Sequence, residues 1–128
     1  MDPIQVLQDG AVRVSEATYA VCRTDHSHPA AFATIRDETE TTLIIEESEV
    51  GSLDAETVET GWKRLTFEME LPFELVGFLA TVATELAEAD VSVFVVSSYS
   101  TDHVLVKQEN LDDALSRLEE LGCRILMQ

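Results

Sequence analysis

The stretch that decides the fold is residues 62–128, which read WKRLTFEMELPFELVGFLATVATELAEADVSVFVVSSYSTDHVLVKQENLDDALSRLEELGCRILMQ. Lys63–Leu71 alternates between apolar and polar residues, which is the period of a half-buried strand. Pro72 ends this strand, and apolar residues at helical spacing then predict a helix over residues 73–89. Val91–Ser98 is rich in β-branched residues and apolar on both faces, so we expect a central strand of a sheet.

The rest of the stretch completes the pattern. After a polar turn, His103–Lys107 reads as a strand. Asn110 is a good N-cap for a helix over Leu111–Leu121, and Gly122 suits a left-handed exit from that helix. Cys123–Met127 closes as a strand. The order strand–helix–strand–strand–helix–strand predicts an α+β fold, the ferredoxin-like sandwich with four antiparallel strands and two helices on one face.

The N-terminal half is less regular. Ile4–Leu7 and Ala11–Val14 flank Asp9-Gly10, which is a hairpin signal. Tyr19–Arg23 and Thr42–Ile45 read as strands.

An acidic segment, residues 46–61, separates the two halves. We expect one helical turn in it near Asp54–Val58, and a short helix at Pro29–Phe32. No repeat is visible as identity, yet both halves begin with an alternating strand and a short helical signal. The sequence therefore predicts an N-terminal module with an acidic connection over residues 1–60 and a second module over residues 61–128.

The charge balance is extreme, with 25 acidic against 8 basic residues and a formal net charge of −17. Such a charge repels phosphates, which disfavours nucleic-acid binding. Molar salt shortens the Debye length to about 3 Å and screens self-repulsion. We therefore predict a halophilic protein with an acidic surface.

The apolar runs are too short to cross a bilayer, so we expect no membrane partner. Met1-Asp2-Pro3 shows no signal peptide, which favours a cytoplasmic protein. Cys22 and Cys123 each lie in an apolar run and are expected as buried, reduced thiols, although a disulfide between them stays open.

Several blocks of the sequence carry a family resemblance. They are Gly61-Trp62, residues 71–79 (LPFELVGFL), residues 86–89 (LAEA), residues 91–94 (VSVF) and residues 98–106 (SYSTDHVLV). In this order they resemble the ACT-domain proteins, and more narrowly the small tandem-ACT proteins related to the CASTOR arginine sensors. The N-terminal half is similar chiefly at residues 19–23 and 42–46. The resemblance implies two tandem ACT-like modules.

The resemblance also implies a non-catalytic regulatory protein whose amino-acid ligand sits between two ACT units. The positions that would hold the ligand are the helix-entry loop and the strand–turn region opposite: Val76, Gly77, Phe78, Ser98, Tyr99, Ser100, Thr101 and Asp102. Where the family usually has Ser-Thr-Tyr, this chain has Ser97-Ser98-Tyr99, which keeps a hydroxyl.

The residue types suit a free amino acid. Asp102 could pair with its ammonium or with a basic side chain, and unpaired N–H groups at the helix start could bind its carboxylate. Gly77 would let a ligand approach the backbone, and the serine hydroxyls can donate or accept. The alternative stays open that residues 98–102 form an ordinary polar turn, with Asp102 bonding its own backbone, and that Gly77 only permits close helix packing.

Other chemistry has weaker support. Asp25-His26-Ser27-His28 could offer two imidazoles to a metal, with a third ligand from His103 or an acid. A solvated loop before Pro29 explains this cluster more simply, and we predict no metal site. No nucleophile, zinc or phosphate-loop motif is present, so we predict no enzyme and no cofactor. The rival hypothesis is a ligand-free interaction module that forms homo-oligomers or binds a regulated partner protein through a sheet edge or helix face.

Overall fold

The computed structural model describes residues 2–127. Contacts divide the chain into two compact units: unit 1 holds residues 2–16 and 63–127, and unit 2 holds residues 17–62. In chain order the elements are α1 (Pro3–Gln8), β1 (Ala11–Val14), β2 (Tyr19–Thr24), β3 (Ala33–Arg36), β4 (Thr41–Glu46), the 3-10 helix η1 (Glu47–Ser52), β5 (Ala55–Phe67), α2 (Phe78–Glu88), β6 (Phe94–Ser97), β7 (Asp102–Lys107), the 3-10 helix η2 (Gln108–Asn110), α3 (Leu111–Glu120) and β8 (Arg124–Met127).

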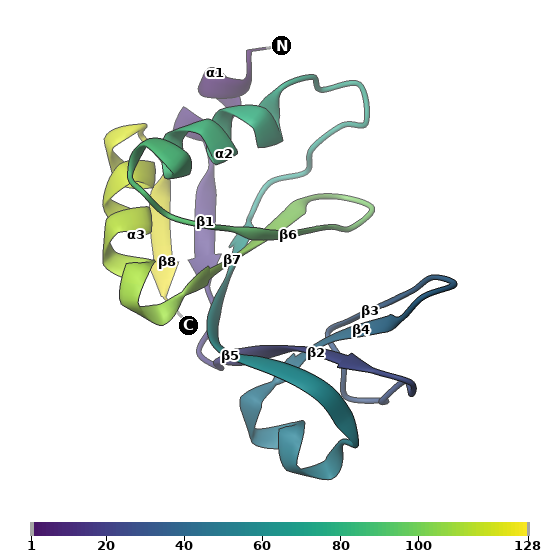
Figure 1. Cartoon of the computed structure of the whole chain (residues 1–128). Helices are drawn as coiled ribbons and strands as arrows, with labels where there is room; N and C mark the ends of the chain where they lie inside the picture. Colours follow the sequence, from purple (N-terminus) through teal and green to yellow (C-terminus); the bar gives the residue numbers. More distant parts are fainter. Residues whose placement is uncertain (1, 128) are drawn as a thin grey trace. The chain divides into compact units, whose positions relative to one another are not determined.

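Unit 1 has the predicted ferredoxin-like fold. The C-terminal part of β5 and the elements α2, β6, β7, α3 and β8 follow one another in the order βαββαβ (Figure 1). The strands are arranged β6-β7-β5-β1-β8, with β6 antiparallel to β7. The mixed α+β architecture read from residues 62–128 is therefore confirmed.

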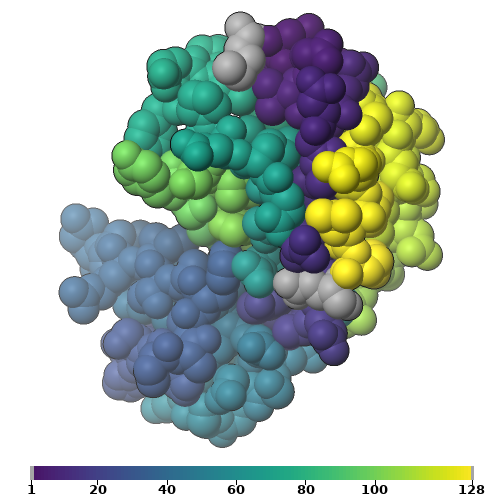
Figure 2. All heavy atoms as spheres, turned by 180° about the vertical axis from the view of Figure 1, so that it is seen from behind, coloured from purple at the N-terminus to yellow at the C-terminus, as the bar shows by residue number. Residues whose placement is uncertain are grey.

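Strand β1 joins this sheet from the N-terminus, so the sheet of unit 1 has five strands in the described chain instead of the four antiparallel strands expected. It pairs antiparallel with β5 and parallel with β8, so Val12 lies between Phe67 and Ile125. In the space-filling view the purple N-terminal residues lie against the yellow C-terminal ones (Figure 2). Residues 2–16 therefore belong with the second half of the chain, whereas the predicted modules divide at residue 60. That division into two ACT-like modules stays a prediction.

The core of unit 1 lies between the sheet and its helices. Alternate residues of β1, β5 and β7 face the buried sides of α1, α2 and α3, as period-two strands and amphipathic helices require. Phe67 meets Phe78 edge to face, with ring centroids 5.1 Å apart. The fully buried members of this core include Leu7, Val12, Leu65, Phe67, Leu86, Val104, Val106 and Leu118.

Unit 2 is built from strands and one 3-10 helix. Its strands are arranged β3-β4-β2-β5, with β4 antiparallel to both β2 and β3. Ala20, Cys22, Leu43 and Ile45 form its buried core. The predicted strands Tyr19–Arg23 and Thr42–Ile45 are confirmed as β2 and β4, while β3 was not predicted.

The N-terminal hairpin prediction was wrong. Residues 3–8 form helix α1, because the Asp2 carboxylate accepts a hydrogen bond of 3.0 Å from the Ile4 N–H and caps the helix. Proline at the first helical position has a suitable φ and no N–H to leave unpaired. The helical turn expected near Asp54–Val58 and the short helix expected at Pro29–Phe32 are also absent from the described chain: β5 begins at Ala55, and turns occupy residues 29–30.

Three further details of unit 1 differ from expectation. Helix α2 begins five residues later than residue 73, and the strand expected over 63–71 ends at Phe67. Strand β6 is shorter than Val91–Ser98, and among residues 2–127 it pairs only with β7, so it is an outer strand. Asn110 precedes α3 without a capping bond from its side chain. Gly122 has the predicted left-handed backbone, with φ of +96°.

Candidate functional site

The predicted binding residues meet at a hollow of about 340 Å³ in unit 1. Its walls are the loop from β5 to α2, the first turn of α2 and the turn between β6 and β7. Six of the eight predicted residues line it: Gly77, Phe78, Ser98, Tyr99, Thr101 and Asp102. Sequence reasoning missed further lining residues: Leu71, Pro72, Phe73, Leu75, Leu79, Ala80 and Ser97.

The other two predicted residues lie beside this hollow. The Val76 side chain is 82% exposed and lines a neighbouring depression. Ser100 borders another one, and its carbonyl accepts a hydrogen bond of 2.7 Å from the Leu71 N–H. Ser100 therefore holds the β5–α2 loop against the β6–β7 turn.

The start of α2 is set by Gly77, which has φ of +90°. L side chains avoid this conformation, whereas glycine adopts it freely. The Gly77 carbonyl accepts bonds from the N–H and the hydroxyl of Thr81, at 2.9 and 2.8 Å, and so begins the helix. The N–H groups of Phe78, Leu79 and Ala80 have no partner within an α-helix and carry partial positive charge. This turn lines the hollow, so that charge faces a possible ligand site.

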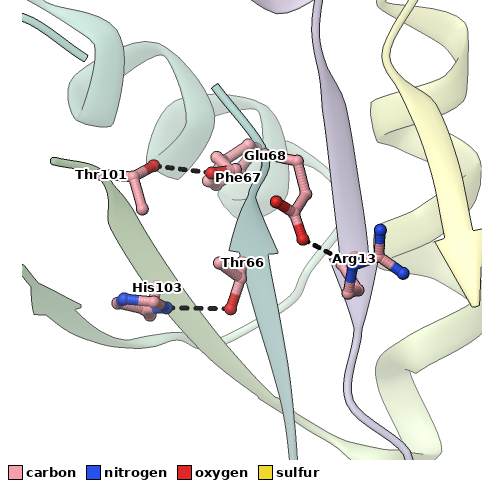
Figure 3. Close-up of polar contacts among 6 residues, drawn as sticks. All are labelled: Arg13, Thr66, Phe67, Glu68, Thr101 and His103. Carbon is pink, nitrogen blue, oxygen red and sulfur yellow. Dashed lines mark hydrogen bonds and ion pairs between the residues drawn. The ribbon is translucent and has the colours of Figure 1, made fainter. Parts of the chain in front are cut away.

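The turn opposite is held by its own side chains. The Ser97 hydroxyl donates a bond of 2.6 Å to Oδ1 of Asp102, and the Ser98 N–H donates one of 2.9 Å to the Thr101 carbonyl. The Thr101 hydroxyl bonds the Phe67 carbonyl at 2.8 Å and ties the turn to β5 (Figure 3). Asp102 thus accepts from a neighbouring side chain rather than from its own backbone. These bonds fit both a plain polar turn and a prepared binding surface.

Histidine 103 connects this turn to the sheet and was not among the predicted binding residues. Its buried ring places Nδ1 2.9 Å from the Thr66 hydroxyl on β5 and Nε2 3.2 Å from the Ser98 hydroxyl (Figure 3 shows the Thr66 contact). Burial and, next, the positive charge of Arg64 lower the pKa of the His103 imidazole, while the Asp102 carboxylate acts in the opposite direction. A neutral ring is therefore favoured.

The hydrogen bonds indicate which nitrogen carries the proton. The Ser98 hydroxyl donates to the Thr101 carbonyl at 3.1 Å, so its oxygen is available to accept from an N–H at Nε2. Nδ1 can then accept from the Thr66 hydroxyl. His103 in this form fixes the position of Ser98 on the wall of the hollow. The sequence signal for this role is the position of His103 directly after the polar turn and before the apolar run of β7.

Two aromatic side chains stand at the mouth of the hollow. Phe73 and Tyr99 meet edge to face, with ring centroids 5.0 Å apart, yet they are 74% and 83% exposed. Asp102, which is half-buried, is the one charged side chain among the described lining residues. The site thus combines one carboxylate, several hydroxyls and an apolar mouth, a set suited to binding.

The side chain of His28 has local hydrogen-bond partners. His28 Nε2 lies 3.1 Å from the Ser52 hydroxyl, and its Nδ1 accepts a bond of 3.0 Å from the Ala30 N–H. Within residues 2–127 no group of three or more His, Cys, Asp or Glu side chains could hold a metal ion. None of the helices in this part of the chain has the length and apolar character needed to cross a bilayer.

Solved structures share this architecture. A protein of Agrobacterium tumefaciens aligns with a TM-score of 0.80 at 22% identity, over 93% of each chain. A Vibrio cholerae protein, described as of unknown function and a possible transport protein, aligns with a TM-score of 0.76 at 25% identity. The alignment covers 93% of this chain and 94% of the Vibrio chain. The ligand-free regulatory subunit of aspartate kinase from Thermus thermophilus aligns with a TM-score of 0.64 at 10% sequence identity. The alignment covers 88% of this chain and 95% of that subunit.

The sequence comparisons point to one family. No curated protein matches the chain. The family model of the ACT domain matches residues 57–120, from the middle of β5 to the end of α3. The narrower relation to the CASTOR arginine sensors stays a prediction. Since the match spans half of the 128 residues and covers the first five of the six βαββαβ elements, from β5 to α3, the chain belongs to the ACT-domain family.

Proposed function

We propose that this protein is a non-catalytic regulator that binds a free amino acid in the hollow of unit 1. The observation that carries the proposal is that the first turn of α2 and the Asp102 carboxylate line the same hollow. A zwitterion offers one group to each of them: its carboxylate to the helix N–H groups and its ammonium to Asp102. The aspartate kinase subunit, described as regulatory, supports a regulatory role through its shared fold.

The polar groups of the hollow have capacity left for a ligand. Asp102 uses Oδ1 for the Ser97 hydroxyl, and an ionised carboxylate accepts several hydrogen bonds. The volume of about 340 Å³ lies at the small end of the range for ligand pockets, which suits a single amino acid. Binding would regulate a partner protein or an oligomer by favouring the conformation with the higher affinity.

Isothermal titration calorimetry against the twenty amino acids in molar KCl tests the proposal. The Asp102→Asn variant should weaken binding at least tenfold, because a charge-assisted hydrogen bond contributes roughly 1.5–3 kcal/mol. Asp54→Asn, at an exposed aspartate in unit 2, is the matched control and should bind as the unmodified chain does. Absence of heat with every amino acid, or equal affinity in the two variants, would refute the proposal.

The second candidate is an interaction module without a ligand. Within residues 2–127, β6 and β8 each pair on one side only, and outer strands are templates for pairing with another chain. This module would form dimers whose dissociation constant is unchanged by amino acids. Sedimentation velocity with and without the amino-acid mixture separates the two candidates.

A further inference from the structure

Most of the hollow is lined by apolar side chains. The loop before α2 and the helix itself contribute leucines, and the two loops contribute one aromatic ring each: Leu71, Leu75, Leu79, Phe73 and Tyr99. The polar groups gather on the opposite strand–turn segment, at Ser97, Ser98, Thr101 and Asp102. The lining therefore has an apolar part and a polar part, which can receive different parts of one ligand.

The two rings of the aromatic pair contact each other but remain largely exposed to solvent. The rings of Phe73 and Tyr99 make an edge-to-face contact, yet both are more than 70% exposed. A contact of this kind restricts the rotamers of both side chains before any ligand arrives. Covering the pair with an apolar group removes hydrocarbon surface from water and is favourable in proportion to the area covered.

The charges of the lining limit what else the ligand carries. Among the described lining residues Asp102 is the one charged side chain, so it can neutralise one ammonium. Within this hollow a second cation of the ligand would meet leucine and aromatic surfaces, because the carboxylates of Glu70 and Glu74 line the neighbouring depression instead. A ligand with an anionic side chain would find no basic side chain there, and a charge buried without a partner is costly.

We propose that the hollow is selective for amino acids with a large, uncharged, apolar side chain, and that Phe73 and Tyr99 form the wall that recognises it. This inference rests on the proposed function and specifies the ligand of the same site. Asp102 serves the ammonium common to all amino acids, whereas the apolar wall discriminates between side chains. Phe73 and Tyr99 are thus specificity-determining residues.

Calorimetry in molar KCl with leucine, phenylalanine, alanine, lysine and aspartate measures this selectivity. Leucine and phenylalanine should bind about 10- to 100-fold more tightly than alanine, as expected for burial of an apolar side chain. Lysine and aspartate should bind more weakly than leucine by at least tenfold. A preference for lysine or aspartate, or equal affinity for leucine and alanine, would overturn the inference while the proposed function stood.

Variants of the wall supply the second measurement. Phe73→Ala and Tyr99→Ala should each weaken leucine binding several-fold more than alanine binding, and so lower the leucine-to-alanine affinity ratio. Tyr99→Phe should keep the ratio, because the ring and not the hydroxyl is the recognition element. Ile35→Ala removes a 49%-exposed apolar side chain from β3 in unit 2 and should change nothing. An unchanged leucine-to-alanine affinity ratio in both alanine variants would refute the role of the wall. A chain that binds none of the twenty amino acids would refute the proposed function itself.

Discussion

The imidazole of His103 on β7 lies 2.9 Å from the hydroxyl of Thr66 on β5, within the sheet of unit 1. The same ring reaches Ser98 in the turn that lines the hollow. One side chain therefore links the sheet to the candidate binding surface. Because burial and Arg64 oppose its protonation, this link is sensitive to acid.

The stability of the protein should fall as the pH drops below the ordinary histidine value of 6.5. The folded pKa of His103 is lowered, so between the unfolded and the folded pKa the unfolded chain binds more protons. The free energy of unfolding then decreases with falling pH and this contribution levels off below the folded pKa. Urea denaturation at a series of pH values in constant molar KCl measures how the free energy of unfolding changes with pH.

The His103→Gln variant isolates this contribution. Glutamine can still hydrogen-bond with hydroxyl groups but does not titrate, so its stability should depend less on pH just below 6.5 than that of the unmodified chain. His26→Gln, at an exposed histidine of unit 2, is the control and should keep the original slope. Identical slopes in all three proteins would show that His103 does not carry the effect.

Gly122 should be intolerant of alanine. Its φ is +96°, and a Cβ there would lie 3.1 Å from Cγ and 3.3 Å from Cα of Gln8. A left-handed backbone costs an L residue roughly 1–2 kcal/mol, and the contact with α1 adds to it. Gly122→Ala should therefore lower the free energy of unfolding by at least that amount. Gly51→Ala, where no atom lies within 4 Å of the added Cβ, is the matched control and should differ little from the unmodified chain.

Both thiols should resist modification in the folded protein. Cys22 and Cys123 are free and buried, at 1% and 3% exposure. Burial raises the pKa of both thiols, that of Cys123 to about 11 despite the opposing effect of Arg124. Since the thiolate is the reactive form, a disulfide reagent at mildly alkaline pH should label the native chain far more slowly than the urea-unfolded one. Cys22→Ala and Cys123→Ala assign the rate to each thiol, and rapid labelling of either native variant would contradict the expected burial.

The local elements of the fold could be predicted where side-chain periodicity alone decides them. Strand β7 and helix α3 follow the sequence closely, because their apolar residues recur at strand and helix spacing. Helix α1 was mistaken for a strand because the Asp9-Gly10 turn signal outweighed Asp2-Pro3, which is a helix-start signal. The pairing of β1 with β5 and β8 was not predicted, since it joins residues more than fifty positions apart and no local pattern specifies it.

Most polar residues that line the hollow were predicted, with Ser97 as the exception. The cluster from Ser98 to Asp102 and the glycine at 77 stand out by residue type, and the fold brings both to one hollow. Of the apolar wall, Tyr99 was among the predicted residues. Phe73 was not, because Phe73 and Leu75 were assigned to a helix that in fact begins after Gly77. Because Gly77 has a positive φ and α2 begins after it, Phe73 and Leu75 lie in a loop that lines the hollow and not on a buried helix face.

Salt should stabilise this protein strongly. A formal net charge of −17 on 128 residues produces self-repulsion, which molar salt screens to a distance of about 3 Å. The free energy of unfolding should rise between dilute buffer and molar KCl by more than about 1 kcal/mol, the scale of a few surface charge interactions. A variant with Glu38, Glu40 and Glu70 changed to Gln carries three fewer negative charges at exposed positions and should gain less from salt. Equal stability of the unmodified chain in dilute and molar KCl would exclude the halophilic adaptation, because screening would then have no repulsion to relieve.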